Sequence, residues 1–301
     1  MINIKGFEIK KGEKVSDLVK AMKNMGLQAT NVARAVEIIK EMEKNNTTIF
    51  LTFTSNMVSS GLREIFAQLC KEKKVHVIIT TVGSIEEDFM KSNSDFFLGD
   101  FNLDDKELYK KGMNRVGNII IPSKAYVDFE KRIQPILKEM YEEKKIWKPW
   151  EITKRLGEKL NDEKSFLYWC AKNDIPVFCE AMLDGAFGLQ VYFFKQEHKD
   201  FVIDETGEEK LAEMVLNAER TGGIILGGGV AKHHAIGVNL LRDGFDYAVY
   251  ITTATEFDGS MSGARTNEAI SWGKLKSNAK HVYIQGDASI IFPLIVGAWF
   301  D

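Results

Sequence analysis

A lysine and a tryptophan lie two residues apart near the carboxyl end of the chain, in a segment rich in reactive groups. The segment runs from Glu256-Phe257-Asp258-Gly259-Ser260 to Glu268-Ala269-Ile270-Ser271-Trp272-Gly273-Lys274. Lysine in water is an ammonium with a pKa of about 10.4, and in that form it is a poor nucleophile. Apolar burial, which the Trp272 indole can supply, favours a neutral amine able to attack an imine or a carbonyl. On spacing alone the alternative, a surface lysine in the first turn of an amphipathic helix, is favoured, and a covalent role for Lys274 stays open.

Two further groups can serve the same chemistry. Glu268 lies within two helical turns of Lys274, so its carboxylate can reach the amine or a cationic substrate. Asp258-Gly259-Ser260 is a turn signal that precedes this helix. His233, in Lys232-His233-His234, can supply a base, although a lone histidine in such a place is more often structural.

Small residues indicate a possible phosphate site. Gly227-Gly228-Gly229 follows an apolar run and allows close approach of the backbone to a nucleotide, yet a glycine triplet also marks a simple turn. Thr54-Ser55-Asn56 and Ser59-Ser60-Gly61 can hold a pyrophosphate at a helix start, or they can cap the helix. Taken alone, the segment 54–61 favours helix capping over pyrophosphate binding.

A pair of glutamates follows another predicted strand. Ser84-Ile85-Glu86-Glu87 has the form of a capping box, with Ser84 as the cap and Glu87 at the third helical position. The alternative is that both carboxylates face a cleft at the strand ends and bind a cationic ligand.

Seven runs rich in β-branched and aromatic residues alternate with helical patterns, which are clearest in 14–45 and 129–160. The predicted strands are 47–54, 75–81, 118–122, 175–179, 222–226, 247–253 and 281–285. Most are continuously apolar, as strands buried on both faces are. The pattern predicts an α/β fold with a doubly wound, mostly parallel Rossmann-like sheet and helices on both faces. Ligands of such folds bind at the carboxyl ends of the strands.

Bulk composition excludes several classes of protein. The chain has 301 residues, 45% hydrophobic and 28% charged, with a net charge of −3, so nucleic acid and anionic membranes are not expected as main partners. Residues 1–301 are expected to form one domain. Cys70, Cys170 and Cys179 show no CxxC pairing, which favours reduced thiols and no structural metal site. The start of the chain lacks the apolar core of a signal peptide, and residues 290–300 are too short to span a bilayer, so a cytoplasmic protein is expected.

The chain contains a series of short motifs in a characteristic order. They are Met25-Gly26-Leu27-Gln28-Ala29-Thr30, 54–56, 59–64, 86–88, Asn114-Arg115-Val116-Gly117-Asn118, 175–178, 184–185, 227–234, 246–248, 256–274 and 287–289. In this set the chain resembles the deoxyhypusine synthase family over nearly its whole length. Its short termini resemble archaeal members more than eukaryotic ones.

The resemblance implies a homotetramer of Rossmann-like NAD-binding subunits, with active sites between paired subunits. It implies that NAD takes hydride from spermidine, that 1,3-diaminopropane leaves, and that Lys274 holds the aminobutyl group as an imine. The group then passes to one lysine of the translation initiation factor 5A precursor, and the stored hydride reduces it to deoxyhypusine. The hypothesis of a covalent Lys274 agrees with this role.

The same resemblance implies two sets of binding residues. NAD is expected to contact Ser55, Asn56, Met57, Val58, Ser59, Thr81, Val82, Gly83, Asp184, Gly228, Thr253, Ala254, Asp287 and Ala288. The amine substrate is expected to contact Glu86, Glu87, His233, Gly259, Ser260, Glu268 and Trp272, with Lys274 and His233 as the catalytic pair.

The chain departs from the family pattern at the amine site. Leu189 and Met261 stand where the family usually has aspartates that face the polyamine, and Val82 and Ser84 alter a glycine-rich turn. Loss of one partner of a buried charge pair costs about 3–5 kcal/mol. Spermidine would then bind about a hundredfold more weakly, unless Glu86, Glu87 or Glu268 compensates. We therefore keep open the hypothesis that the amine donor is not spermidine but another amine, such as putrescine or agmatine.

Two rival functions stay open. A homospermidine synthase-like enzyme would transfer the aminobutyl group to putrescine and need no protein acceptor. A catalytically weak subunit of a mixed tetramer would bind NAD without turnover. Lys274, Glu268 and Trp272 argue against this second rival, whereas Leu189 favours it.

Overall fold

The computed structural model describes residues 1–206 and 209–301, and these form two compact units. The first unit contains residues 1–53, 74–79 and the described chain from 209 onward. The second contains residues 54–73 and the described chain from 80 onward to 206. None of the helices in the described ranges combines the length and the apolar character needed to cross a bilayer.

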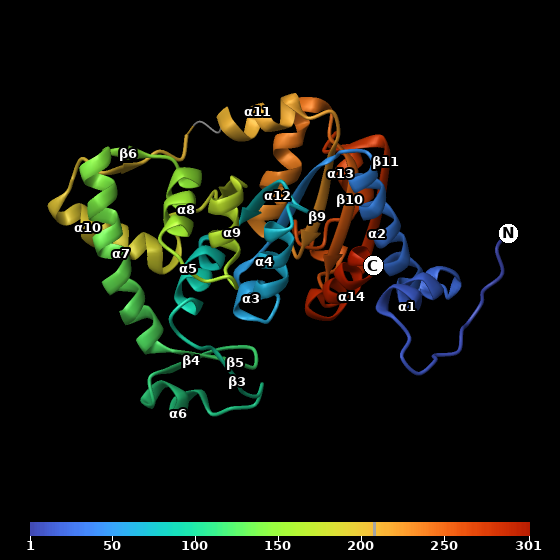
Figure 1. Cartoon of the computed structure of the whole chain (residues 1–301), viewed down its shortest axis with the longest axis horizontal. Helices are drawn as coiled ribbons and strands as arrows, with labels where there is room; N and C mark the ends of the chain where they lie inside the picture. Colours follow the sequence, from blue (N-terminus) through green and yellow to red (C-terminus); the bar gives the residue numbers. More distant parts are fainter. Residues whose placement is uncertain (207–208) are drawn as a thin grey trace. The chain divides into compact units, whose positions relative to one another are not determined.

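A parallel sheet forms the centre of the first unit (Figure 1). Its strands are β1 (Thr48–Phe53), β2 (Val77–Thr80), β9 (Thr221–Leu226), β10 (Phe245–Thr252) and β11 (Leu275–Gln285), in the order β11-β10-β9-β1-β2. β9 pairs in parallel with β1 and β10, and β10 pairs in parallel with β11. Every residue of β9 is buried, as expected for a strand covered on both faces. The predicted parallel α/β fold is confirmed.

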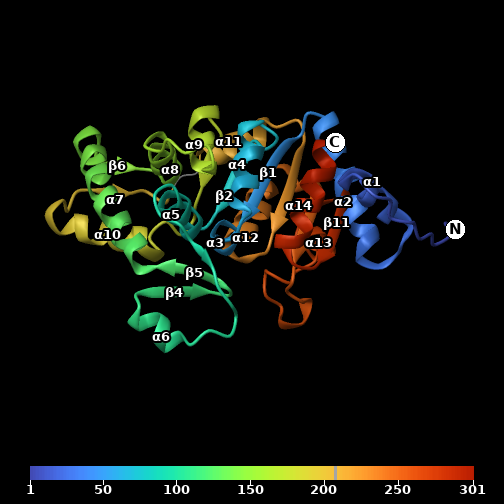
Figure 2. The ribbon, with the colours of Figure 1, turned by 60° about the horizontal axis from the view of Figure 1, so that its bottom comes forward.

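Helices cover both faces of this sheet. One layer consists of α1 (Val15–Ala21), α2 (Leu27–Lys44) and α14 (Ala288–Phe300), with the short η1 (Met22–Asn24) beside α2. The other contains α11 (Glu209–Asn217), α12 (Gly229–Val238) and α13 (Thr266–Ser271), with η2 (Asn239–Arg242) and η3 (Glu256–Asp258). Figure 2 shows α14 beside α1 and α2. The helical pattern predicted for 14–45 is therefore correct.

The second unit is mostly helical. Its helices are α3 (Ser55–Ser59), α4 (Arg63–Lys71), α5 (Val82–Lys91), α6 (Asp105–Lys110), α7 (Ser123–Glu143), α8 (Pro149–Glu158), α9 (Phe166–Asn173) and α10 (Gly185–Glu197). Its strands are β3 (Phe97–Leu98), β4 (Met113–Val116), β5 (Ile119–Pro122), β6 (Ile146–Trp147), β7 (Val177–Phe178) and β8 (Val202–Ile203). In Figure 2, β4 and β5 form a small sheet beside α6.

Two sequence expectations about this unit are wrong. The run 118–122 was expected in the parallel sheet, but β5 lies in the antiparallel sheet β3-β5-β4. Val116 pairs with Ile119, so Gly117, with a φ of 60°, and Asn118 form a two-residue hairpin turn. The single helical stretch expected over 129–160 is broken after α7, because Pro149 starts a new helix at its first position.

Candidate active site

Three neighbouring parallel strands end at one edge of the sheet in the first unit. The Gly227 N–H donates to the carbonyl of Ile251 at 2.8 Å, and the Gly286 N–H donates to the carbonyl of Thr252 at 2.9 Å. These bonds hold the segments that follow β9, β10 and β11 side by side. The residues gathered at this edge include the predicted cofactor residues Gly228, Thr253, Ala254, Asp287 and Ala288.

Gly228 is required for close packing within this edge. A Cβ at position 228 would lie 2.2 Å from the Cα of Ser262, which no side chain can tolerate. The triplet thus allows the loop after β10 to approach the start of α12. Asp287 also has a structural task, because its carboxylate accepts the N–H of Ser289 at 2.8 Å and caps α14.

A cavity of about 290 Å³ lies in the first unit between α12, the loop after β10 and α13. Its lining consists of Lys232, His233, Ile236, Tyr250, Gly259, Met261, Ala264, Arg265, Glu268, Ala269, Trp272 and Lys274. The structure therefore brings together five predicted residues from α12, the loop after β10, α13 and the start of β11. Ser260 is not part of the lining, whereas Met261 is.

Lys274 and Trp272 are neighbours in this cavity, but the indole does not bury the amine. The Lys274 Nζ lies 5.4 Å from the centroid of the Trp272 ring. Trp272 is itself 67% exposed, because it is the C-cap residue of the six-residue α13. The expected proximity is found, and Lys274 is half-buried in this chain.

Lys232 is the buried amine of the cavity, and the sequence did not single it out. Only 1% of Lys232 is exposed, and its Nζ donates to the carbonyl of Ala264 at 2.6 Å. Burial lowers the pKa of Lys232 to about 8, partly opposed by the charge of Glu268. The signal was its place among the apolar residues 230–231 and 235–236, since a lysine inside an apolar helix turn is buried with it.

His233 lies on the exposed side of α12 and faces the same cavity. Partial burial lowers its pKa, and the positive charges of Lys274 and His234 lower it further. The neutral imidazole is therefore the main form at neutral pH, as a general base needs.

Glu86 and Glu87 are both buried on α5 in the second unit. Burial raises the pKa of Glu86 to about 7; the Phe187 N–H, which Glu86 accepts at 2.8 Å, acts in the opposite direction. Burial also raises the pKa of Glu87 to about 7, and the hydroxyl of Ser59 donates to this carboxylate. Two carboxylates that are half-protonated near neutral pH are poised to gain full charge when a cation approaches.

The predicted capping box at 84–87 is wrong. α5 begins at Val82 with Thr81 as its N-cap residue, so Ser84 lies inside the helix and accepts a hydrogen bond from the Thr80 hydroxyl at 2.7 Å. The β2 strand ends at Thr80, and this short connection starts the helix two residues earlier than the box required. Both glutamates are therefore free of a capping task at the start of α5.

The first turns of α3 and α5 are close neighbours. A Cβ at Gly83 would lie 2.8 Å from the Cβ of Ser55, so glycine permits this approach. The Thr54 hydroxyl donates to Oδ1 of Asn56 at 2.6 Å and does not cap α3, contrary to the interpretation favoured for this segment alone. Asp184 is the N-cap residue of α10 and accepts the Gly185 N–H.

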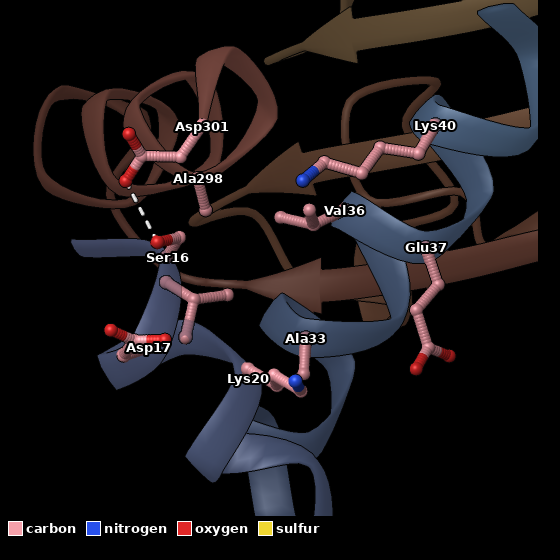
Figure 3. Close-up of a pocket in the computed structure, with 10 residues that line it drawn as sticks. Ser16, Asp17, Lys20, Ala33, Val36, Glu37, Lys40, Ala298 and Asp301 are labelled. Carbon is pink, nitrogen blue, oxygen red and sulfur yellow. Dashed lines mark hydrogen bonds between the residues drawn. The ribbon is translucent and has the colours of Figure 1, made fainter. Parts of the chain in front are cut away.

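Two other cavities differ in their relation to the predicted residues. Figure 3 shows one of about 410 Å³ between α1, α2 and α14, in which the Ser16 hydroxyl donates to Asp301 at 2.7 Å. None of the predicted site residues lines it. The other, of about 360 Å³, lies in the second unit beside Ser59 and Lys91. Within residues 1–206 and 209–301, no cluster of three or more His, Cys, Asp or Glu side chains is arranged to hold a metal ion.

The protein has an α/β fold with a parallel sheet, and its amine-lined cavity is formed by α12, the loop after β10, α13 and the residues that lead into β11. The family model for deoxyhypusine synthase matches residues 17–299. The deoxyhypusine synthase of Kluyveromyces lactis is 40% identical over 99% of this chain and 92% of its own length. That of Senecio vernalis is 43% identical over 99% of this chain and 88% of its own. A Pyrococcus abyssi relative is 43% identical over 94% of this chain and 90% of its own.

Comparison with solved structures gives the same family. A crystal structure named for a deoxyhypusine synthase of Entamoeba histolytica matches with a TM-score of 0.73 at 30% identity, over 99% of this chain and 96% of that one. AgrE, solved with ornithine and NAD+, has a TM-score of 0.53 at 12% identity over 91% of this chain and 33% of its own, a likeness of fold. The chain belongs to the deoxyhypusine synthase family, as its motifs predicted. It is a transferase of hypusine biosynthesis.

Proposed function

We propose that this protein transfers the aminobutyl group of spermidine to one lysine of the translation initiation factor 5A precursor, with NAD as cofactor. The observation that carries this proposal is the cavity in which Lys274, His233, Glu268 and Trp272 meet. These are an amine nucleophile, a neutral base, a carboxylate for an ammonium group and an aromatic surface for an alkyl chain. Family membership supplies the reaction class.

NAD, when bound, accepts a hydride from the donor and later returns it. Lys274 attacks the oxidised carbon of the donor, so a C–N bond forms at Nζ while the bond to 1,3-diaminopropane breaks. His233 takes the proton that Lys274 must lose before this attack. Glu268 binds the ammonium end of the chain, and the acceptor lysine then displaces Lys274. The whole reaction involves no net change in oxidation state, because the hydride removed from the donor would be returned to the product.

We propose that residues 1–301 act as one NAD-binding domain and that the residues indicated by the family motifs bind the cofactor. They are the predicted set Ser55–Ser59, Thr81–Gly83, Asp184, Gly228, Thr253, Ala254, Asp287 and Ala288. Support comes from the close approach at Gly83 and from the strand ends that align Gly228 with Thr253 and Asp287. The fold neighbour AgrE was solved with NAD+, which agrees with a dinucleotide in this class of fold.

A homotetramer with active sites between paired subunits accounts for the exposed indole. Trp272 and Phe257 are both largely exposed in the single chain, and large aromatic side chains at such positions are typical of interfaces. A partner subunit over Trp272 would supply the apolar surroundings that Lys274 lacks here. We propose the cytoplasm as the place of reaction, because the acceptor is a translation factor.

One observation favours a second candidate, a transferase that uses another amine. Met261 lines the cavity, so Glu268 is its only carboxylate in the described chain. Putrescine or agmatine as donor, or putrescine as acceptor to give homospermidine, would need fewer anionic partners than spermidine does. A weak NAD-binding subunit would need none of the groups that meet beside Lys274.

Borohydride trapping tests the proposal. The protein is incubated with NAD, the factor precursor and spermidine, putrescine or agmatine, and the adduct is located by peptide mass analysis. We expect an aminobutyl adduct on Lys274 and transfer to the precursor, with both lost in Lys274→Arg. Lys280→Arg is the matched control, since Lys280 is an exposed lysine of β11, the strand that follows Lys274, and is paired with Glu41. Full activity of Lys274→Arg, or no adduct with any amine, would contradict the proposal.

A further inference from the structure

Lys232 is tied to the loop that forms one wall of the active-site cavity. Its Nζ lies 2.6 Å from the carbonyl oxygen of Ala264 and 4.6 Å from the centroid of the Tyr250 ring. Lysine is almost never fully buried without a partner, and here the partner is a neutral carbonyl. Because burying this amine is costly, we expect Lys232 to have a specific role in the cavity.

The position of Ala264 shows what the tie holds. Residues 259–264 contain the cavity residues Gly259 and Met261, and they lead into α13 with Glu268. Gly228 packs against Ser262 of the same turn. Two successive turns of α12 therefore fix this loop, one by a close backbone approach and one by the Lys232 hydrogen bond.

Lys232 also contributes charge to the cavity. Its amine lines the same space as His233, Arg265, Glu268 and Lys274. Arg265 is paired with Glu256, so the Lys232 charge is opposed mainly by Glu268. An incoming ammonium group meets a cavity whose charge depends on whether Lys232 is protonated.

We propose that Lys232 is a positioning residue, which holds the turn 259–264 against α12 and whose charge state controls how tightly the cavity accepts a cationic amine. The inference rests on the proposed function and adds to it a determinant of amine affinity. A neutral amine still donates to Ala264, so the turn stays held after the proton is lost. Repulsion of the substrate ends at that point.

The pH dependence follows from burial. Because the pKa of Lys232 is lowered to about 8, the residue is charged at pH 7 and mostly neutral at pH 9. We expect the KM for the amine donor to fall about fivefold between these values, beyond what the donor's own titration produces. The titratable and charged groups that line the same cavity are Glu268, His233, Arg265 and Lys274, and the Lys232 amine lies over the Tyr250 ring.

Two substitutions separate the two parts of the proposal. Lys232→Met removes the donor and the charge, and we expect the amine KM to rise about tenfold at pH 7, with the NAD KM within twofold of the original. Lys232→Arg keeps a donor and a permanent charge, so its amine KM should lie close to the original at pH 7 and should not fall by pH 9. Comparison with the original protein cancels the titration of the donor and of Glu86 and Glu87.

Lys280→Met is the control for loss of a lysine in the same unit, and it should match the original protein at both pH values. An unchanged amine KM in Lys232→Met, or a fall in KM for Lys232→Arg equal to that of the original protein, would overturn the proposal. So would an original protein whose amine affinity does not rise from pH 7 to pH 9. Calorimetric binding of the amine gives this last result without turnover, so it stands even if trapping on Lys274 fails and the proposed reaction is wrong.

Discussion

Glu87 accepts a hydrogen bond from the hydroxyl of Ser59, and this contact joins a predicted amine-binding residue to a predicted cofactor-binding residue. Lys91, one turn further along α5, donates to the carbonyls of Val58, Ser59 and Ser60 at 2.9 to 3.1 Å. The end of α3 is thus fixed from α5 by a carboxylate and an ammonium. Any change in the charge of Glu87 acts directly on the segment expected to hold the cofactor.

The raised pKa of Glu87 predicts a stabilising substitution. The folded-state value of about 7 lies above the ordinary value of 4.5, so stability falls as pH rises from 4.5 to 7 and stays lower above it. Glu87→Gln keeps an acceptor for Ser59 and should raise the free energy of unfolding by about 1–3 kcal/mol at pH 8, with little gain at pH 4.5. Urea denaturation at both pH values measures this. Glu64→Gln, at a more exposed position of α4, is the control, and an equal gain at both pH values would argue against the cause given.

The two departures from the family pattern predict a gain of donor affinity. Leu189 is 51% exposed on α10, and Met261 lines the cavity. Met261→Asp combined with Leu189→Asp should lower the KM for spermidine by about tenfold or more, because each adds a carboxylate for an ammonium group. Leu183→Asp controls for added charge, since Leu183 is 52% exposed before the same helix. An unchanged ratio of KM values for spermidine and putrescine would show that these positions do not select the donor.

Two glycines of the same helical segment should respond in opposite ways to alanine. Gly228→Ala places a Cβ 2.2 Å from the backbone of Ser262, so it must displace the turn 259–264. We expect loss of amine transfer and a lower melting temperature. Gly237, inside α12, has open space around its Cβ position, so Gly237→Ala should stabilise the protein by about 0.5–1 kcal/mol. Thermal unfolding of both variants checks the pair, and a stable, active Gly228→Ala would show that the loop does not need this approach.

A buried ion pair holds the helices of the second unit together. Arg63 Nε lies 2.5 Å from Asp88, and its Nη2 lies 2.6 Å from Asp162. Arg63→Met leaves Asp88 buried without its charged partner and should cost about 3–5 kcal/mol in the free energy of unfolding. Arg115→Met breaks the exposed pair with Asp105 and should cost little. Chemical denaturation compares them, and similar losses would refute the role of burial.

The sequence was sufficient for the parallel sheet because buried strands and the small residues after them carry a local signal. β9 and the Gly227-Gly228-Gly229 turn are a clear case, since an apolar run and its glycines are adjacent in the chain. The apolar run of β5 predicts a strand but not its sheet, because four apolar residues do not reveal the pairing partner of the strand. The Gly117-Asn118 turn held that information.

The same distinction applies to the amines of the cavity. The motif identifies Lys274, but the exposure of its amine depends on where the Trp272 ring points, which is set by the end of α13. The sequence alone does not reveal Lys232 as a buried amine, because its burial results from a loop more than thirty residues away, at Ala264. Glu86 and Glu87 were identified as a pair, while their raised pKa values depend on burial that only the folded chain creates.

The exposure of Trp272 gives the protein an optical probe at its active site. Of its five tryptophans, Trp147, Trp169 and Trp299 are buried and Trp150 is half-buried, whereas Trp272 is 67% exposed. An indole in water fluoresces at longer wavelength and is quenched readily by dissolved iodide. Binding of an amine, the acceptor protein or a second subunit over the Lys274 cavity should therefore shift the Trp272 emission to shorter wavelength and reduce its quenching by iodide.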